Sequence, residues 1–158
     1  MKKLLLAATC LGLIAGTHMA NAATATGSLG VSAQLTVTCT VNSPSIAFGT
    51  IASDAGVSSG SAAINVSCNG APVSPTIALD TGLNSLGVVA TTRALSNGTN
   101  FLDYDLYTNA GLTTVWSSAQ SVTVSAGSGT LTVYGKIPAA QYQPAGLYSD
   151  TVGITLNY

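Results

Sequence analysis

Apolar and polar residues alternate with a period of two along most of the chain, between short clusters of Gly, Ser, Asn and Pro. Such alternation is typical of β-strands with one buried face, and it predominates over the 3.6-residue period of an amphipathic helix. The pattern predicts nine strands, over residues 35–41, 45–51, 62–68, 76–79, 91–95, 101–107, 121–124, 130–137 and 148–158. Short strands at this spacing, separated by polar turns, predict an all-β sandwich.

A segment near the start of the chain is too long for one ordinary strand. Over residues 28–38, one face carries Leu29, Val31, Ala33, Leu35 and Val37, and every intervening residue is Gly or polar. An extended segment of this length spans about 36 Å, roughly twice an ordinary strand. We therefore expect residues 27–35 to have a task of their own and residues 36–41 to form the first core strand.

The C-terminal segment shows the opposite problem, because nothing follows it that could cover it. Its apolar face carries Val152, Ile154, Leu156 and Tyr158, which alternate with Gly153, Thr155 and Asn157. A strand this apolar needs a covered face and a paired backbone edge, since otherwise it promotes aggregation. The sequence thus combines a spare strand near its start with a vacant position beside its last strand.

The first 22 residues have the pattern of a secretory signal. Lys2 and Lys3 precede an apolar run over residues 4–14, and Ala20-Asn21-Ala22 supplies small residues at the expected cleavage site. A transmembrane anchor is less favoured, because it would need about 20 apolar residues and glycine interrupts this run. We predict export, with cleavage after residue 22.

The charge and the cysteine content of the chain exclude some classes of function. Only 6% of the residues are charged and the formal net charge is -1, which argues against an ordinary cytosolic enzyme and removes any electrostatic case for binding nucleic acid. Downstream of residue 22 the chain has two cysteines, Cys39 and Cys68. In an exported chain such a pair is most simply a disulfide.

Catalytic and metal-binding motifs are weak. Asp103 and Asp105 are the one close carboxylate pair, and with backbone oxygens they could hold Ca²⁺, although a solvated strand face is the better interpretation. No histidine follows residue 22 to assist acid–base chemistry, and no Gly-x-Ser-x-Gly elbow is present. We predict no enzyme activity, no cofactor and no metal.

Several phrases, in their order and spacing, resemble the spore coat protein U domain family, the pilin subunits of archaic (Csu-type) chaperone-usher pili. The phrases are Cys39-Thr40-Val41, Ala47-Phe48-Gly49, Ile64-Asn65-Val66-Ser67-Cys68, Leu79-Asp80-Thr81-Gly82, Arg93-Ala94-Leu95, Leu102-Asp103-Tyr104-Asp105-Leu106-Tyr107, Thr132-Val133-Tyr134-Gly135-Lys136-Ile137-Pro138 and Gly146-Leu147-Tyr148-Ser149-Asp150-Thr151-Val152. The resemblance covers essentially the whole chain after the signal.

This resemblance implies an incomplete immunoglobulin-like sandwich that lacks its last strand and receives it from another molecule. It implies three parts: a signal peptide (1–22), a donor-strand extension (23–35) and a pilin domain (36–158). The donor face would carry Leu29, Val31, Ala33 and Leu35, and the accepting groove would be flanked by Val152, Ile154, Leu156 and Tyr158.

The implied partners are other pilin subunits, a periplasmic chaperone and an outer-membrane usher, and the implied product is a cell-surface pilus for adhesion and biofilm formation. Two alternatives stay open at this point. The first is a self-complemented ligand-binding module, in which the N-terminal strand fills its own groove. The second is a minor or tip pilin of the same system.

Overall fold

The computed structural model describes residues 22–54, 56–70, 74–84 and 93–158. Residues 1–21 of the predicted signal therefore lie outside the described residues. No helix in the described part of the chain is long and apolar enough to cross a bilayer. The chain divides into two units at residues 33 and 34, and each unit is considered separately. In the first unit, residues 22–33 form no strand and are exposed throughout.

The second unit, Gln34–Tyr158, contains only strands and loops in its described part. Its eight strands are β1 (Thr38–Val41), β2 (Ser58–Asn69), β3 (Thr76–Leu79), β4 (Arg93–Ser96), β5 (Phe101–Tyr107), β6 (Gln120–Ser121), β7 (Ser128–Ile137) and β8 (Ile154–Asn157). The all-β fold class predicted from the sequence is confirmed.

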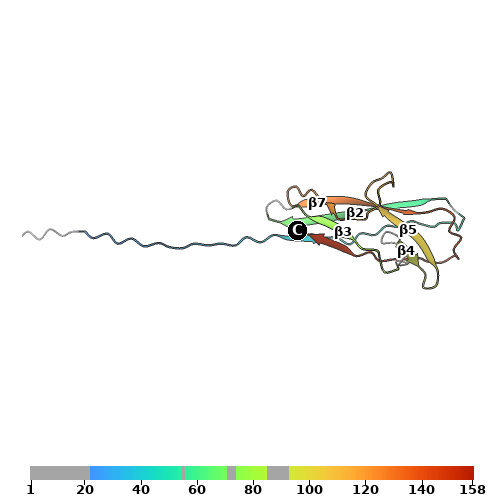
Figure 1. The fold of residues 1–158 in the computed structure, drawn as a ribbon, viewed down its shortest axis with the longest axis horizontal. Coiled ribbons are helices and arrows are strands. Elements are labelled where there is room, and N and C mark those ends of the chain that lie inside the picture. Colours follow the sequence, from blue (N-terminus) through green and yellow to red (C-terminus); the bar gives the residue numbers. More distant parts are fainter. Residues whose placement is uncertain (1–21, 55, 71–73, 85–92) are drawn as a thin grey trace, which may run out of the picture. The chain divides into compact units, whose positions relative to one another are not determined.

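The strands form two antiparallel sheets. The larger sheet has the order β1-β2-β7-β5-β4, and the smaller one has the order β6-β3-β8. The longest ladder of the larger sheet joins β2 to β7. It runs from the pair Ser58 and Ile137 to the pair Ser67 and Ser128. Figure 1 shows β2 and β7 side by side and the C-terminal strand, in red, beside β3.

The core lies where the apolar faces of the sheets meet. Along β2, Ile64, Val66 and Cys68 are buried while the intervening Asn65 and Ser67 are exposed, as the period of two requires. The buried hydrophobic cluster comprises Cys39, Ile64, Val66, Cys68, Ile77, Tyr104, Leu106, Trp116, Val122, Val133 and Ile137. Each fully buried large apolar side chain stabilises the fold by about 1.5–3 kcal/mol.

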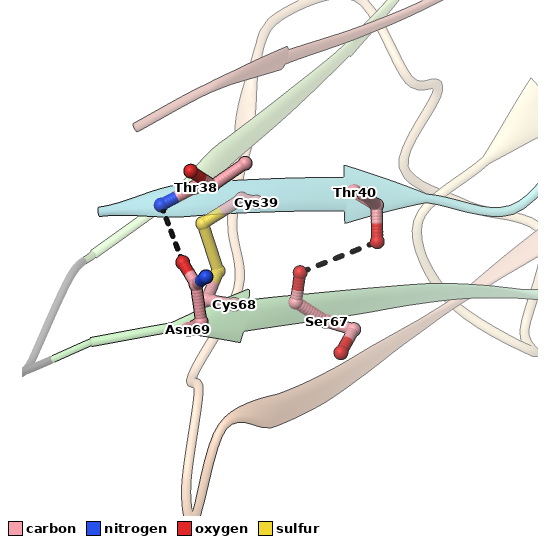
Figure 2. The surroundings of a disulfide bond; sticks show 6 residues. All are labelled: Thr38, Cys39, Thr40, Ser67, Cys68 and Asn69. Atoms are coloured by element: carbon pink, nitrogen blue, oxygen red, sulfur yellow. Dashed lines mark hydrogen bonds between the residues drawn. A yellow bond between two sulfur atoms is a disulfide. The ribbon is translucent and has the colours of Figure 1, made fainter. Parts of the chain in front are cut away.

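A disulfide joins Cys39 of β1 to Cys68 of β2, as the cysteine count predicts (Figure 2). The two residues are direct partners in the ladder, and their Cα atoms are 4.1 Å apart. On the chain-entropy estimate, which is model-dependent, closing a loop of this size stabilises the fold by about 3–4 kcal/mol. The disulfide fixes the short edge strand β1 to the long strand β2.

Two of the predicted strands, 76–79 and 101–107, match β3 and β5 at both ends. Strand β2 begins at Ser58 rather than at residue 62, because the Ser-Ser-Gly-Ser start lacks apolar alternation but pairs with the end of β7. The prediction over 121–124 becomes the two-residue β6. The prediction over 91–95 becomes β4 from Arg93, and residues 91 and 92 lie outside the described residues.

Three more of the predicted strands are partly or wholly absent. Residues 45–51 form no strand, and the last strand starts at Ile154 instead of residue 148. The first strand also starts late, at Thr38 instead of residue 35. Residues 45–51 pair with no described strand, and residues 148–153 pair with β4 only through the isolated bridge between Ser96 and Ser149, so neither segment forms a regular ladder.

Candidate functional site

A groove of about 800 Å³ opens within the second unit, and we call it the open groove. Leu95 of β4, Leu102 of β5 and Ile137 of β7 are three of the apolar residues that line it. One wall is formed by residues 46–53 and the other by residues 140–150. The open groove therefore has apolar lining from three strands of the larger sheet and walls that come from loop segments.

The first wall has the pattern of a strand without being part of a sheet. Ile46 and Phe48 are half-buried and pack against the core, whereas Ala47 and Gly49 between them are exposed. The Phe48 ring meets the Tyr104 ring edge-on, with centroids 6.3 Å apart. The Phe48 carbonyl accepts a hydrogen bond from the Ser58 hydroxyl at 3.3 Å. The wall is thus held chiefly by side-chain packing.

The second wall is bonded along one edge. Ser149 exchanges two backbone hydrogen bonds with Ser96, of 2.9 and 3.0 Å, and the carbonyls of Thr151 and Gly153 accept from Leu83 and Asp80, each at 3.1 Å. These odd-numbered residues direct their backbone groups toward β3 and β4. In an extended chain the alternate residues direct theirs to the opposite edge, so the even-numbered residues present backbone groups on the other side.

Four described strands end the two sheets, and two of them, β1 and β8, adjoin the walls of the open groove in the chain. Strand β8 ends the order of the smaller sheet and β1 ends that of the larger one, so neither has a second partner among the described strands. The two strands are in contact with each other. Downstream of β1 and upstream of β8, the chain forms the two walls of the open groove. Both flanking segments line the open groove, and the Tyr142 N–H of the second wall donates a hydrogen bond to the Ser53 carbonyl of the first at 3.2 Å.

Asp150 fixes the second wall to its surroundings. Its Oδ1 accepts hydrogen bonds from the Leu83 and Asn84 backbone N–H groups at 3.0 and 3.3 Å and from the Asn84 side chain at 3.1 Å. Its Oδ2 accepts from the Tyr104 hydroxyl at 2.7 Å. Burial and the carboxylate of Asp150 raise the pKa of Tyr104 well above its ordinary value, so the phenol stays a donor.

Asp80 holds the segment that follows the second wall. Its Oδ1 accepts hydrogen bonds from the backbone N–H groups of Gly82 and Gly153, at 2.9 and 2.7 Å. The Asp80 carbonyl accepts from Nε and Nη2 of Arg93, at 3.0 and 2.8 Å, and Arg93 is buried. Charge-assisted hydrogen bonds are the strong ones, so the two carboxylates make this wall rigid.

The predicted acceptor residues lie beyond the second wall, on the segment that continues from it into β8. Val152, Ile154 and Leu156 are half-buried and pack against the core, and Tyr158 is exposed. On this side the open groove itself is lined further upstream, by residues 140–150. The assignment of these four residues as the acceptor stays a prediction.

Sequence reasoning missed the opposite wall and part of the apolar lining. Ile46 and Phe48 carry strand alternation, and the phrase Ala47-Phe48-Gly49 was a signal that could have located the wall. Leu95, Leu102 and Ile137 could not be grouped in advance, because they come from three strands whose order the sequence does not state.

The predicted donor residues are exposed. Leu29, Val31 and Leu35 are 89%, 86% and 89% exposed, and Ala33 is exposed as well. Large apolar side chains in one row at such exposure are unusual in a protein that functions alone. Their role as a donor face stays a prediction.

The candidate carboxylate pair lies elsewhere, on β5. Asp105 is the ladder partner of Lys136, and Asp103 exchanges backbone hydrogen bonds of 2.7 and 2.8 Å with the Gln141 side-chain amide. Burial raises the pKa of the Asp105 carboxyl. The structure gathers no group of three or more potential ligands around a metal position within the described residues.

Comparison with known proteins gives two findings. No curated protein matches the chain. Among solved structures, it is similar to a chain in the crystal structure of the CsuC-CsuE chaperone-tip adhesion subunit pre-assembly complex, from archaic chaperone-usher Csu pili of Acinetobacter baumannii. The TM-score is 0.58 at 22% identity, over 77% of this chain and 40% of the matched chain, so this protein spans less than half of that chain's length.

The sequence profile of one family covers most of the chain. The profile described as Spore Coat Protein U domain matches residues 25–155, which include the first seven described strands, the first two residues of β8 and the whole of the open groove. The chain therefore belongs to the Spore Coat Protein U domain family.

Proposed function

We propose that this protein is a structural subunit of an archaic chaperone-usher pilus, exported through the periplasm and polymerised by donor strand exchange. Residues 23–35 of one copy would insert as a strand into the open groove of another. The observation that carries the proposal is the pair of unpaired edges beside the open groove, in a chain whose residues 27–35 carry an exposed apolar face.

Strand addition explains both halves of this observation. An added strand satisfies the open backbone groups by hydrogen bonds, and its alternate side chains enter the space between the sheets. Burying Leu29, Val31 and Leu35 is worth about 5–9 kcal/mol before the costs of ordering, with Ala33 adding less. This is comparable with the whole stability of a domain, so an uncomplemented subunit should be marginally stable.

The geometry of assembly follows from where the two parts lie in the chain. Donor and acceptor are different surfaces of the same subunit, so each contact is heterologous and the series continues instead of closing on itself. A filament results. The similar solved structure is a complex of a pilus subunit with a chaperone, which supports a chaperone as the temporary occupant of the groove before assembly at an outer-membrane usher.

The test compares the mature chain with a variant that lacks residues 23–34. We expect the mature chain to form filaments in electron micrographs and ladders on unheated SDS gels. The truncated chain should form neither, yet it should bind a synthetic peptide of residues 23–35 and melt at a higher temperature with it. Ladders from the truncated chain would exclude donor strand exchange.

A self-complemented module predicts a different result in the same experiment. The mature chain, refolded alone, would then elute as a stable monomer in size-exclusion chromatography and would not take up the peptide. Adhesion to surfaces and biofilm formation are the expected roles of the assembled pilus at the cell surface.

A further inference from the structure

Residues 34–53 form one continuous segment that links the N-terminal segment to the first wall of the open groove. Residues 34–37 connect the N-terminal segment to β1, and residues 46–53, shortly after β1, form the first wall of the open groove. In a pilus, tension on the inserted N-terminal segment would enter the subunit at this point. The backbone would then carry the pull directly toward the groove that holds the next subunit.

Strand β1 alone is a weak anchor against such a pull. It has four residues and pairs on one edge only, with β2. The wall beyond it has no ladder in the described structure and is held by Ile46 and Phe48 packing on the core. A pull that detached β1 would reach this wall next.

Strand β2 is a strong anchor. It has twelve residues, and it lies between β1 and β7, with ten of its residues paired to β7. Its removal would require breaking ladders on both edges and extracting Ile64 and Val66 from the core.

The disulfide lies between the entry point and the groove wall. Cys39 is the second residue of β1, and its bond to Cys68 joins it to the end of β2 (Figure 2). Beside it, the Thr38 N–H donates to Oδ1 of Asn69 at 2.8 Å, and Val37 packs against Gly70. The covalent loop from Cys39 to Cys68 contains the whole first wall, residues 46–53.

We infer that the Cys39–Cys68 disulfide is a force-bearing clamp that separates the open groove from tension in the subunit's own donor segment. This inference rests on the proposed function, because the tension arises only in a filament of inserted strands. The pull passes from Cys39 across the sulfur atoms into β2, which is held by its ladder with β7, and the chain between residues 40 and 57 is bypassed. The first wall keeps its place, and the neighbour's strand stays bound.

Single-filament stretching tests the clamp. Wild-type filaments are compared with those of Cys39→Ser combined with Cys68→Ser. Without the bond, detachment of residues 38–51 should add up to about 50 Å of extension for each subunit before rupture, because an extended chain spans about 3.5 Å per residue. Rupture should follow at lower force, since the groove loses one wall. Oxidised wild-type filaments should show no such added length.

Two further experiments distinguish loss of the clamp from a general loss of stability and from a failure to fold. Val133→Ala removes buried core volume from β7, opposite Ala62 of β2, and leaves the disulfide in place, so its filaments should keep the wild-type extension. If the double serine variant does not assemble, wild-type filaments reduced after assembly should show the added length once thiol labelling confirms that the bond is open. Equal extension and equal rupture force in oxidised and reduced filaments would overturn the clamp. A wild-type chain that forms no filaments would overturn the proposed function instead.

Discussion

Gly60 of β2 lies directly opposite Gly135 of β7, and both glycines face the first wall of the open groove. A Cβ on Gly135 would come within 2.7 Å of Cζ of Phe48, and one on Gly60 within 2.8 Å of Cγ2 of Ile46. The paired glycines therefore create a flat place on the sheet where two side chains of the wall are seated. This explains why glycine stands in two strand interiors, where it otherwise weakens a strand.

Gly135→Ala should disturb the packing of Phe48 against the sheet. The added methyl group displaces the Phe48 ring, and overpacking of this kind costs about 1–3 kcal/mol. We expect lower stability in urea and weaker binding of a peptide of residues 23–35 to the chain that lacks residues 23–34. Gly56→Ala is the matched control for stability in urea, because no atom lies within 4 Å of a Cβ there. Equal losses of stability in both variants would show that the paired glycines do not position the first wall.

Tyr104→Phe should weaken the second wall. The variant keeps the ring contact with Phe48 but removes the hydroxyl that donates to Oδ2 of Asp150 at 2.7 Å. A hydrogen bond to a charged group contributes about 1.5–3 kcal/mol, so the free energy of unfolding should fall by about that amount. Chemical denaturation measures the change. Tyr134→Phe, on a half-buried tyrosine of β7, is the control and should change stability little.

The sequence predicts the strands that have partners better than the segments that do not. Residues 76–79 and 101–107 carry clear alternation and pair within the chain, so prediction and structure agree. Residues 45–51 carry the same alternation without forming a strand. Alternation indicates that one face is buried, but it does not indicate whether a partner strand is present for the backbone.

Other features depend on contacts between distant residues. The hydrogen bond between Tyr104 and Asp150 spans 46 residues, and no motif marks either side chain as a partner of the other. The disulfide could be predicted, because export and a count of two cysteines leave one pairing.

Val31→Asp should block assembly without unfolding the subunit. The side chain is 86% exposed in the chain itself, so a charge there costs little before insertion. Insertion would then bury an unpaired carboxylate between the sheets, at a cost of several kcal/mol. We expect loss of SDS-resistant ladders together with an unchanged melting temperature. Ser32→Asp is the control: an inserted strand would direct this residue away from the core, and its ladders should persist.

Asp105→Asn should change how stability depends on pH. Burial raises the pKa of the Asp105 carboxyl above its ordinary value of 3.8, and Asp103 adds to this, whereas Arg93 and Lys136 oppose it. The folded protein then binds this proton more tightly than the unfolded chain does. Wild-type stability therefore falls as pH rises from about 3.8 through the raised pKa, and the penalty is constant at higher pH.

Asparagine cannot ionise, so the variant lacks this penalty. The stability of Asp105→Asn minus that of the wild type should therefore be larger at pH 7 than at pH 3. At pH 3 the wild-type carboxyl is protonated in both the folded and the unfolded state. The lost attraction to Lys136 is the smaller effect, because the net shift of the pKa is upward. Thermal melts of both proteins at the two pH values measure the difference in Tm. A difference in Tm that is the same at pH 3 and pH 7 would show that the Asp105 charge is not destabilising in the folded subunit.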